Sequence, residues 1–390
     1  MKDMKILSMK ALARQIRGVS YKPEDLHDGP DSSSIMLLRA NNIGDGRINF
    51  KDVVYVDRTR VSQEQLLQKG DILICASSGS KSLVGKAATF DLDMEVTFGA
   101  FCKVVRPNDT ENMEYISMFF QSPHYRHEIS TVAIGANINN IRNEHIDALQ
   151  VQWPSDESRK SAVAILSKTD SIIRYRKGEL QALDNLIKAR FVEMFGSPDL
   201  GAKKPDWKPI SSIGTVVGGA TPKTSIPEYW DGEYRWITPA ELDNASGYIY
   251  DSARKLTEAG IKSCSLTEMP VGTVILSSRA PIGKVAIAGN TFYCNQGFKN
   301  IICGDGIHPV FLYSLLCMNS DYLNSLGRGA TFKEISKSIV ENILIPVPSM
   351  ENQEEYASFV AQVDKSRVVV QKALNEVQLL FDSLMQNYFG

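Results

Sequence analysis

One stretch of this sequence occurs twice, and this repeat limits the folds that the chain can adopt. The segment from Gly135 to Gly196 returns from Gly329 to Gly390, 194 positions later and without a gap. The matching landmarks are Gly135 with Gly329, Ile141 with Ile335, Pro154 with Pro348, Asp170 with Asp364, and Phe195–Gly196 with Phe389–Gly390. A long internal repeat of this kind predicts a chain built from two similar halves.

The second part of each copy predicts one long helix with a narrow apolar stripe. Its apolar residues follow one another in steps of three and four, which is the spacing of a coiled-coil seam. In the first copy these positions are Leu166, Ile173, Leu180, Leu183, Ile187 and Met194. In the second copy they are Val360, Val363, Val370, Leu374, Val377, Phe381, Leu384 and Tyr388. We therefore expect the two helices to pair with each other; the simpler alternative is two unconnected amphipathic helices.

Both long helices have recognisable ends. Ser155 and Ser349 stand where an N-terminal capping hydroxyl is expected, and acidic residues follow in the first turn. Gly196 and Gly390 stand where a glycine commonly ends a helix. A helix of about 40 residues is about 60 Å long at 1.5 Å per residue.

The remainder of each half predicts a mixed α/β domain. In the first half, the expected strands are 35–39, 53–56, 71–75, 85–89 and 100–105, with a helix at 113–120. The same order of elements continues over residues 209–328. The sequence pattern pairs Gly70 with Gly272, Ser77–Ser78 with Ser277–Ser278, Gly85–Lys86 with Gly283–Lys284, and Phe98–Phe101 with Gln296–Lys299. A polar stretch rich in proline and glycine, 196–208, predicts a joint between the halves.

Composition places the chain among ordinary globular proteins of a reducing compartment. It has 390 residues, of which 43% are hydrophobic and 23% are charged. No apolar run is long enough for a membrane span, the first residues lack a signal-peptide core, and the six cysteines show no paired spacing, so we expect a cytoplasmic protein. The net charge of −2 argues against a protein that coats DNA by itself, because non-specific affinity comes from Lys and Arg.

The sequence lacks the motifs of the enzymes that it could otherwise represent. It contains no Pro-Pro dipeptide, which adenine methylation requires within its catalytic turn, and no glycine-rich loop suited to S-adenosylmethionine. The segment Gly79–Ala87 has one residue too many between its glycines and ends in Ala, so it is not a P-loop. His124 and His127 have no third ligand nearby in sequence. We therefore expect a chain without catalysis, metal or cofactor of its own.

Polar loops that mix basic, amide, hydroxyl and aromatic residues remain as the candidate binding surface. These groups can contact base edges and phosphates, although composition alone indicates only a polar recognition surface. In the first half the candidates are Arg17, Tyr21, Lys22, Arg39, Asn41, Asn42, Ser78, Lys81, Lys86, Asn137 and Asn139. In the second half they are Thr221, Lys223, Tyr229, Trp230, Thr238, Arg279, Lys284, Asn295, Gln296, Lys299, Thr331 and Lys333.

The loops of the second half resemble those of a known family. The segments Thr221–Pro222, Glu228–Trp230, Trp236–Thr238, Ser278–Gly283 and Asn295–Lys299 are similar to target recognition domains of the specificity subunits of type I restriction–modification systems. The resemblance extends over essentially the whole chain. The first half is more divergent, because it lacks the Glu-Tyr-Trp run and carries Thr97–Gly99 in place of Asn295–Gly297.

The resemblance implies an α+β architecture with five parts. These are target recognition domain 1 (1–154), conserved helix 1 (155–196), a linker (197–208), target recognition domain 2 (209–348) and conserved helix 2 (349–390). In such proteins the two helices pair as an antiparallel coiled coil with pseudo-twofold symmetry. Each recognition domain reads one half of a bipartite DNA site, and the helices set the spacer between the half-sites.

The resemblance also implies partners that supply the chemistry. Two methylation subunits dock on the helices and use S-adenosylmethionine for adenine methylation. Restriction subunits add ATP- and Mg-dependent cleavage in the full complex. Two alternatives remain open at this stage: the recognition part of another class of restriction–modification enzyme, and a coiled-coil adaptor with no role at DNA.

Overall fold

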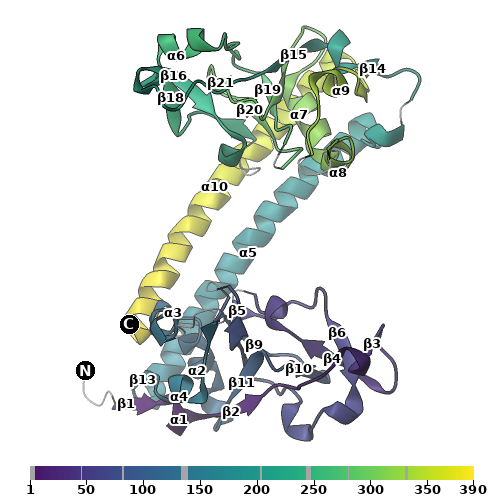
Figure 1. Ribbon diagram of the computed structural model, residues 1–390. Helices are drawn as coiled ribbons and strands as arrows, with labels where there is room; N and C mark the ends of the chain where they lie inside the picture. Colours follow the sequence, from purple (N-terminus) through teal and green to yellow (C-terminus); the bar gives the residue numbers. More distant parts are fainter. Residues whose placement is uncertain are drawn as a thin grey trace. The chain divides into compact units, whose positions relative to one another are not determined.

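The computed structural model describes two compact units, each built from one globular part and half of each long helix. The first unit comprises Met1–Lys177 and Ala373–Gly390, and the second comprises Gly178–Lys372. The described residues are 5–44, 46–80, 83–132, 139–202, 204–242, 247–279, 281–329 and 333–390. Figure 1 shows the two units and the long helices α5 (Asp156–Phe195) and α10 (Met350–Phe389). The mixed α/β class of each half is confirmed.

The globular part of the first unit contains two main sheets. The five-stranded sheet has the order β2-β11-β7-β9-β5, and the four-stranded sheet has the order β10-β4-β6-β3. The strands of the first sheet are β2 (Ala13–Arg17), β5 (Gly46–Arg47), β7 (Ile72–Cys75), β9 (Ala87–Thr89) and β11 (Cys102–Pro107). Those of the second are β3 (Leu26–His27), β4 (Ser34–Leu38), β6 (Val54–Asp57) and β10 (Val96–Phe98). All five strands expected from the sequence are present.

Shorter elements complete the first unit. The helices are α1 (Met9–Leu12), α2 (Met113–Phe119), α3 (Pro123–Val132) and α4 (Asn143–Asp147). Two-stranded pairs are β1 (Lys5–Ser8) with β13 (Gln150–Trp153), and β8 (Ser77–Ser78) with β12 (Asn139–Asn140). The helix expected at 113–120 corresponds to α2, which packs its apolar face into the core of this unit.

The second unit repeats this plan with different side chains. Its five-stranded sheet has the order β15-β22-β19-β20-β17, and a three-stranded sheet has the order β18-β16-β21. These strands are β15 (Gly214–Gly218), β16 (Trp230–Ile237), β17 (Tyr248–Ile249), β18 (Arg254–Leu256), β19 (Val274–Leu276), β20 (Val285–Ala288), β21 (Tyr293–Cys294) and β22 (Lys299–Cys303). The remaining elements are β14 (Lys208–Pro209), β23 (Leu344–Ile345), α6 (Glu258–Ser263), α7 (Pro309–Met318), α8 (Ser320–Ser325) and α9 (Lys337–Glu341).

Matching backbone hydrogen bonds confirm the repeat between the globular parts. Gly70 donates to Phe90 in the first unit, and Gly272 donates to Ala288 in the second, both at 2.8 Å. Both glycines have positive φ, at 90° and 85°, which favours glycine at this turn. Gly85 donates to Cys75, and Gly283 likewise donates to Ser277. The sequence alignment of Gly70 with Gly272 and of Gly85–Lys86 with Gly283–Lys284 is therefore correct.

Two other parts of that alignment are wrong. The N–H of Ala76 bonds the carbonyl of Phe101, and the N–H of Ser278 bonds the carbonyl of Gly297. Ser278 therefore corresponds to Ala76 rather than Ser78, and Gly297 corresponds to Phe101. The counterparts of Phe98–Phe101 are thus Cys294–Gly297. Local sequence similarity misled the alignment, because the strand register moves these loop residues by two positions.

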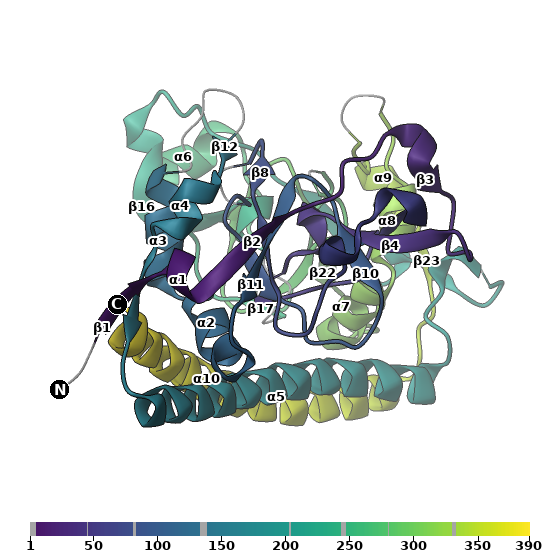
Figure 2. The same ribbon diagram turned by 90° about the horizontal axis from the view of Figure 1, so that it is seen from below.

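The helices α5 and α10 run antiparallel within each unit, as Figures 1 and 2 show. In the first unit, Leu166 near the start of α5 shares a core with Met385 near the end of α10. In the second unit, Arg190 near the end of α5 contacts Glu355 near the start of α10 at 2.6 Å. The predicted seam residues are all buried or half-buried: Leu166, Ile173, Leu180, Leu183, Ile187, Val363, Val370, Leu374, Val377, Phe381 and Leu384.

Residues that interrupt the apolar seam have polar partners of their own. Arg367 contacts Asp184 on the facing helix at 2.7 Å. Thr169 is buried, and its hydroxyl donates to the carbonyl of Ile165 at 2.8 Å, within its own helix. These contacts satisfy polar groups that would otherwise be costly to bury in the seam.

The same aromatic contact joins the globular part to the long helices in both units. Phe389 at the end of α10 lies 5.0 Å from Tyr115 on α2, measured between ring centroids. Phe195 at the end of α5 lies 4.9 Å from Phe311 on α7. The two contacts involve equivalent positions of the repeat, and each closes the core of its unit.

The joint between the halves is more ordered than its composition suggested. Leu200 and Trp207 are buried in the core of the second unit. The N–H of Leu200 also donates to the side chain of Asn319 at 3.0 Å. These apolar anchors explain why a segment rich in proline and glycine is held against the domain that follows it. In the part of the chain that the structure describes, no helix is long and apolar enough to cross a membrane.

Candidate nucleic-acid interface

Loops from distant parts of the sequence meet in the second unit and form what we call the second loop cluster. It consists of residues 219–223, 238–242, 277–279, 295–299, 328–329 and 333–335. The hydroxyl of Thr221 donates to Oε1 of Gln296 at 2.6 Å. The N–H of Ser278 donates to Gly297, and the N–H of Ile335 donates to Ser278. Most of the second-half candidate residues are thus brought together on one set of loops.

The loop at 238–242 is fixed to this cluster by a lysine and a close backbone approach. Nζ of Lys284 donates to the carbonyls of Pro239 and Leu242, at 3.3 and 2.9 Å. A Cβ at Gly297 would lie 3.0 Å from Cγ of Pro239, so this position has little room for a side chain. The carboxylate of Glu241 accepts from the N–H of Thr238 at 2.8 Å, which closes the turn. Lys284 therefore shapes a loop in addition to carrying charge.

Trp230 and Trp236 support the 219–223 loop of the second loop cluster. Trp230 is only 6% exposed, and its ring N–H donates to the carbonyl of Lys223 at 3.3 Å. The ring N–H of Trp236 donates to Ala220 at 3.1 Å. Their rings pack edge to face, and the Arg254 guanidinium lies 3.5 Å from the Trp230 ring centroid. The sequence predicts a DNA contact for Trp230, but its side chain is buried and supports the loop instead.

The remaining second-half candidates divide into braced and exposed side chains. Nζ of Lys299 contacts Glu334 at 3.2 Å and Ser278 at 3.4 Å, and Oδ1 of Asn295 accepts from the N–H of Gly297. Tyr229, Thr238 and Arg279 are half-buried. The exposed candidates are Thr221, Lys223, Gln296 and Lys333, whereas Thr331 lies outside the described residues. Arg328, which the sequence did not single out, is also exposed and pairs its backbone with Glu334 in this cluster.

The first unit builds an equivalent set of loops, which we call the first loop cluster: residues 17–22, 39–42, 75–80, 99–101 and 139–141. Ile141 donates its N–H to Ala76, as Ile335 does to Ser278 in the second unit. Ser77–Ser78 pairs with Asn139–Asn140 as two short antiparallel strands. Arg39 and Asn42 form the turn that corresponds to Thr238 and Glu241, since Oδ1 of Asn42 accepts from the N–H of Arg39 at 2.8 Å.

The candidates of the first unit have different surroundings. Asn42 is fully buried and donates to the carbonyls of Asn49 and Lys51, so it shapes its loop rather than facing a ligand. Arg39 is half-buried and donates to the carbonyl of Asp52 at 2.7 Å. Arg17, Lys22 and Asn41 are exposed; Tyr21, Ser78 and Lys86 are half-buried. Lys81, Asn137 and the side chain of Asn139 lie outside the described residues.

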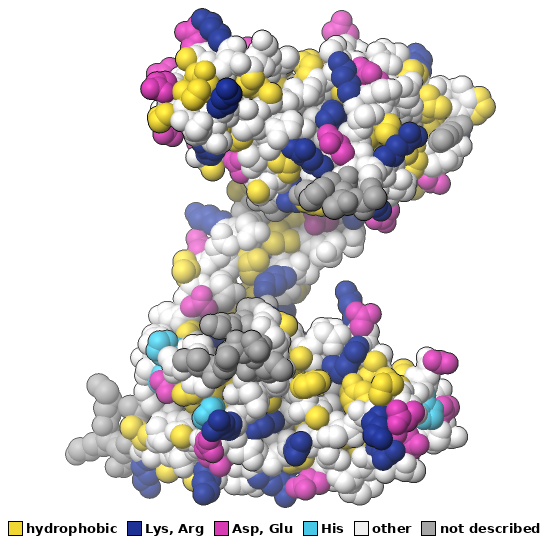
Figure 3. All heavy atoms as spheres, in the orientation of Figure 1, with side chains coloured by type: hydrophobic (Ala, Val, Ile, Leu, Met, Phe, Trp, Pro, Cys, Tyr) yellow, Lys and Arg dark blue, Asp and Glu magenta, His cyan; other side chains and the backbone are white. Residues whose placement is uncertain are grey.

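The electrostatic surface is mixed. On the face drawn in Figure 3, Lys and Arg side chains are interspersed with Asp and Glu on both units.

Burial raises the pKa of the Cys294 thiol beside the second cluster to about 12, which keeps it protonated at neutral pH. Among the described residues, no group of three or more His, Cys, Asp or Glu side chains is placed to hold a metal ion.

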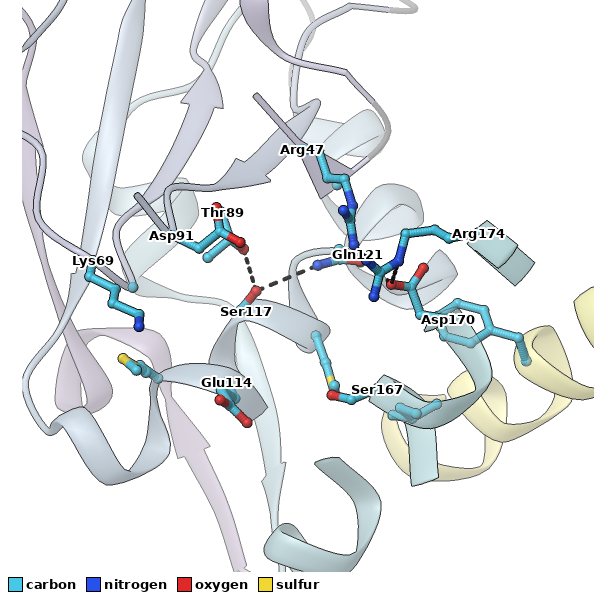
Figure 4. Close-up of a pocket in the computed structure, with 16 residues that line it drawn as sticks. Arg47, Lys69, Thr89, Asp91, Glu114, Ser117, Gln121, Ser167, Asp170 and Arg174 are labelled. Carbon is cyan, nitrogen blue, oxygen red and sulfur yellow. Dashed lines mark hydrogen bonds and ion pairs between the residues drawn. The ribbon is translucent and has the colours of Figure 1, made fainter. Parts of the chain in front are cut away.

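A separate pocket of about 260 Å³ lies in the first unit, between the sheet and α5 (Figure 4). The Asp170 carboxylate on α5 contacts Arg47 on β5 at 3.1 Å and Arg174 one turn further along the helix at 3.0 Å. Ser117 on α2 also lines this pocket. The residue at the equivalent position of α7 in the second unit is the larger Tyr313, which packs against Gly247. The ion pair between Arg47 and Asp170 ties the sheet to the helix at this pocket.

Comparison with known proteins identifies the family. The family model for the type I restriction modification DNA specificity domain matches residues 38–185 and again 204–379. The chain belongs to this family. The two matches divide the chain as the internal repeat does, with one copy of the domain in each half.

Several relatives are similar over part or all of the chain. It is 42% identical over 211 residues to the MjaIX specificity subunit of Methanocaldococcus jannaschii, an alignment that covers 52% of this chain and 48% of the relative. It is 32% identical over 203 residues to the EcoKI specificity subunit of Escherichia coli, covering 52% and 44%. These alignments thus span about half the length of the relatives. A third, the putative MjaX specificity subunit of M. jannaschii, is 23% identical over 96% of this chain and 90% of its own length.

Two solved structures share the fold. The type I specificity subunit from M. genitalium has a TM-score of 0.56 at 13% identity, covering 100% of this chain and 96% of the other. A chain from a structural study of type I complex assembly and conformational transition has a TM-score of 0.55 at 16% identity, covering 100% and 98%. At such low identity the likeness concerns the fold, which is the architecture that the sequence resemblance implied.

Proposed function

We propose that this chain is the DNA sequence-specificity subunit of a type I restriction–modification complex. Two target recognition domains, 1–154 and 209–348, each read one half of a bipartite site in double-stranded DNA. The observation that carries the proposal is the pair of loop clusters, because they are built on one repeated backbone but present different side chains. Two domains that share a backbone but expose different side chains are suited to reading two different half-sites.

The mixed surface charge fits a subunit that binds DNA together with partners. Phosphate contacts supply most of the non-specific affinity for DNA, and they need an excess of Lys and Arg. This chain has 43 such residues against 45 Asp and Glu. We propose that the methylation subunits contribute the missing positive charge by enclosing the DNA with it. Base contacts from the loop clusters would then add specificity to an affinity that the whole complex provides.

The long helices carry exposed apolar side chains that support docking of two equal partners. Tyr175 and Val369 occupy the same position of the repeat, as do Leu186 and Leu380, and all four are exposed. Each unit therefore presents one copy of each exposed position, on the outer surface of the helices. Exposed apolar side chains that recur at equivalent positions favour a protein interface over chance. We propose that one methylation subunit docks on each unit.

The chemistry belongs to those partners under this proposal. S-adenosylmethionine is bound by the methylation subunits, and ATP and Mg by the restriction subunits, in the cytoplasm. This chain would contribute recognition and no catalytic group. The paired helices 155–196 and 349–390, joined through the linker 197–208, would set the number of unread base pairs between the half-sites.

Sequencing of modified bases in the host genome tests the proposal directly. The genome is compared with this gene intact and with it deleted, while the neighbouring methylation gene stays expressed. We expect deletion to abolish adenine methylation at one bipartite motif. Complementation with the intact gene should restore that motif alone. An unchanged methylome would contradict the proposal and favour a coiled-coil adaptor without a role at DNA.

A further inference from the structure

Phe101 is an exposed aromatic side chain in the first loop cluster. It is 69% exposed, whereas every other phenylalanine that the structure describes is buried or half-buried. Exposure of a phenyl ring forfeits the favourable transfer of its apolar surface from water. A single exposed apolar residue is common in proteins, so its meaning depends on how the ring is held and on what surrounds it.

The backbone that carries Phe101 is fixed on all sides. Cys102 donates its N–H to Gly99 at 2.8 Å, which closes a tight turn with Phe101 inside it. Ala100 donates to Val19 at 2.9 Å. The carbonyl of Phe101 accepts from both Ala76 and Ser77, at 2.9 and 3.0 Å. The ring therefore projects from a rigid support, and binding through it would cost little backbone entropy.

The repeat places Phe101 at the centre of the recognition loops. Its counterpart in the second unit is Gly297, which lies between the Ser278 loop and the turn at Pro239. In the first unit, Phe101 is bonded to Ala76 and Ser77, and the adjacent Ala100 is bonded to Val19 of the 17–22 loop. Where the second unit presents Gln296 beside a bare glycine, the first unit presents a phenyl ring beside Ala100. The two readers thus differ in chemistry at one equivalent place.

We propose that Phe101 determines specificity by contacting the apolar surface of a base in the half-site read by the first unit. The inference rests on the proposed function. Duplex DNA offers two such surfaces: the methyl group of thymine in the major groove, and the face of a base at an opened step. Both depend on sequence, because only thymine carries the methyl group and some base steps open more easily than others.

The surroundings favour DNA over a partner protein as the occupant. In the described segments 13–23, 38–44, 75–80 and 97–101, Phe101 is the one large apolar side chain that is exposed. A protein interface of useful size requires several such residues together, as the long helices provide. The other accessible side chains of the first loop cluster are mainly hydroxyl, amide and basic, which suit base edges and phosphates.

The test uses the complete complex with its methylation subunits and a duplex that carries the motif found in the methylome. Binding is measured for wild type, Phe101→Ala and the control Ile6→Ala, whose side chain is 66% exposed on β1 of the same unit. We expect Phe101→Ala to weaken binding roughly five- to hundredfold and to lose discrimination at one base pair of one half-site. Ile6→Ala should bind as wild type does.

Two modified duplexes distinguish the two base surfaces. Uracil in place of one thymine removes only the methyl group; it should weaken wild-type binding and leave Phe101→Ala unaffected if the ring meets that methyl. 2-Aminopurine at the same half-site should brighten with wild type and stay quenched with Phe101→Ala if the ring opens a base step.

Each remaining outcome has a separate meaning. Wild-type affinity and discrimination in Phe101→Ala would overturn the inference while leaving the proposed function intact. Failure of the wild-type complex to prefer its motif would overturn the proposed function itself. Loss of the methylation subunits from Phe101→Ala, with an unchanged melting temperature, would show a partner contact and also overturn the inference.

Discussion

Thr221 and Gln296 lie 75 positions apart in the sequence, and the hydroxyl of the first donates to the side-chain carbonyl of the second at 2.6 Å. This bond joins two exposed loops of the second cluster. Strand register pairs these positions with Ser20 and Ala100 in the first unit, and an alanine side chain cannot accept such a bond. This hydrogen bond between loops is therefore specific to the second of the two recognition domains.

The substitution Gln296→Ala should weaken recognition of one half-site only. We expect a loss of about 1–3 kcal/mol in discrimination at that half-site, because an amide that positions or makes a base contact is removed. Both partners are exposed, so the melting temperature should change little. Gln181→Ala on α5 is the matched control, since Gln181 is also exposed and bonds a neighbouring side chain, Asn185. Equal effects at both half-sites would contradict the assignment.

Replacement of Trp230 should act on stability before it acts on binding. Trp230→Ala removes a buried ring, and we expect a loss of about 3–5 kcal/mol in the free energy of unfolding. Trp230→Phe keeps most of the ring but loses the N–H that donates to Lys223, for an expected cost of about 1 kcal/mol. Urea denaturation of the two variants measures both. A normal unfolding free energy with weakened DNA binding would instead restore Trp230 as a contact residue.

Two leucines on α10 lie on different sides of the paired helices, one buried in the seam and one exposed. Leu374 is 8% exposed and Leu379 is 70% exposed. Leu374→Glu buries a charge in the seam, so we expect several kcal/mol of destabilisation and a lower melting temperature. Leu379→Glu should leave the melting temperature unchanged but reduce co-purification of the methylation subunit. If Leu379→Glu co-purifies normally, this outer position takes no part in docking.

The half-buried Asp364 on α10 predicts a pH dependence that Asp364→Asn should remove. Burial raises the pKa of its carboxyl group, and the Arg367 guanidinium opposes this only in part. The folded state therefore favours the protonated form, and wild type loses this contribution as the pH rises from the ordinary carboxyl pKa through the raised value. The melting temperature of Asp364→Asn, relative to wild type, should thus increase between pH 4 and 7. A relative decrease would mean that the contact with Arg367 outweighs burial.

The sequence predicted the elements that depend on local pattern. The two long helices begin at Asp156 and Met350 and end at Phe195 and Phe389, as their serine caps and glycines indicated. Hydroxyls of Ser155 and Ser349 accept from N–H groups three residues on, at 3.4 and 3.3 Å. Periodicity and capping are properties of neighbouring residues, so a single sequence contains them.

The sequence did not reveal which polar residues are buried or which loops meet. Asn42, Lys284 and Trp230 are residue types that commonly contact DNA. In the fold, however, their side-chain N–H groups donate to backbone carbonyls. The sequence pattern pairs Phe101 with Lys299 and gives it no role. Its correct register follows from the hydrogen bond that Ala76 donates to it, which the sequence alone does not show. Strand pairing over long sequence distances decides these assignments, and local composition carries little of that information.

The division of α10 between the units has a consequence for synthesis on the ribosome. The second unit is one continuous segment, Gly178–Lys372, whereas the first needs Ala373–Gly390 to complete its core around Phe389. Translation therefore supplies every residue of the second unit before it supplies the last ones of the first. The domain that emerges earliest must wait, with Tyr115 and Phe119 still lacking their contacts with Phe389, until some 200 further residues have been added. The half that is made first is finished last.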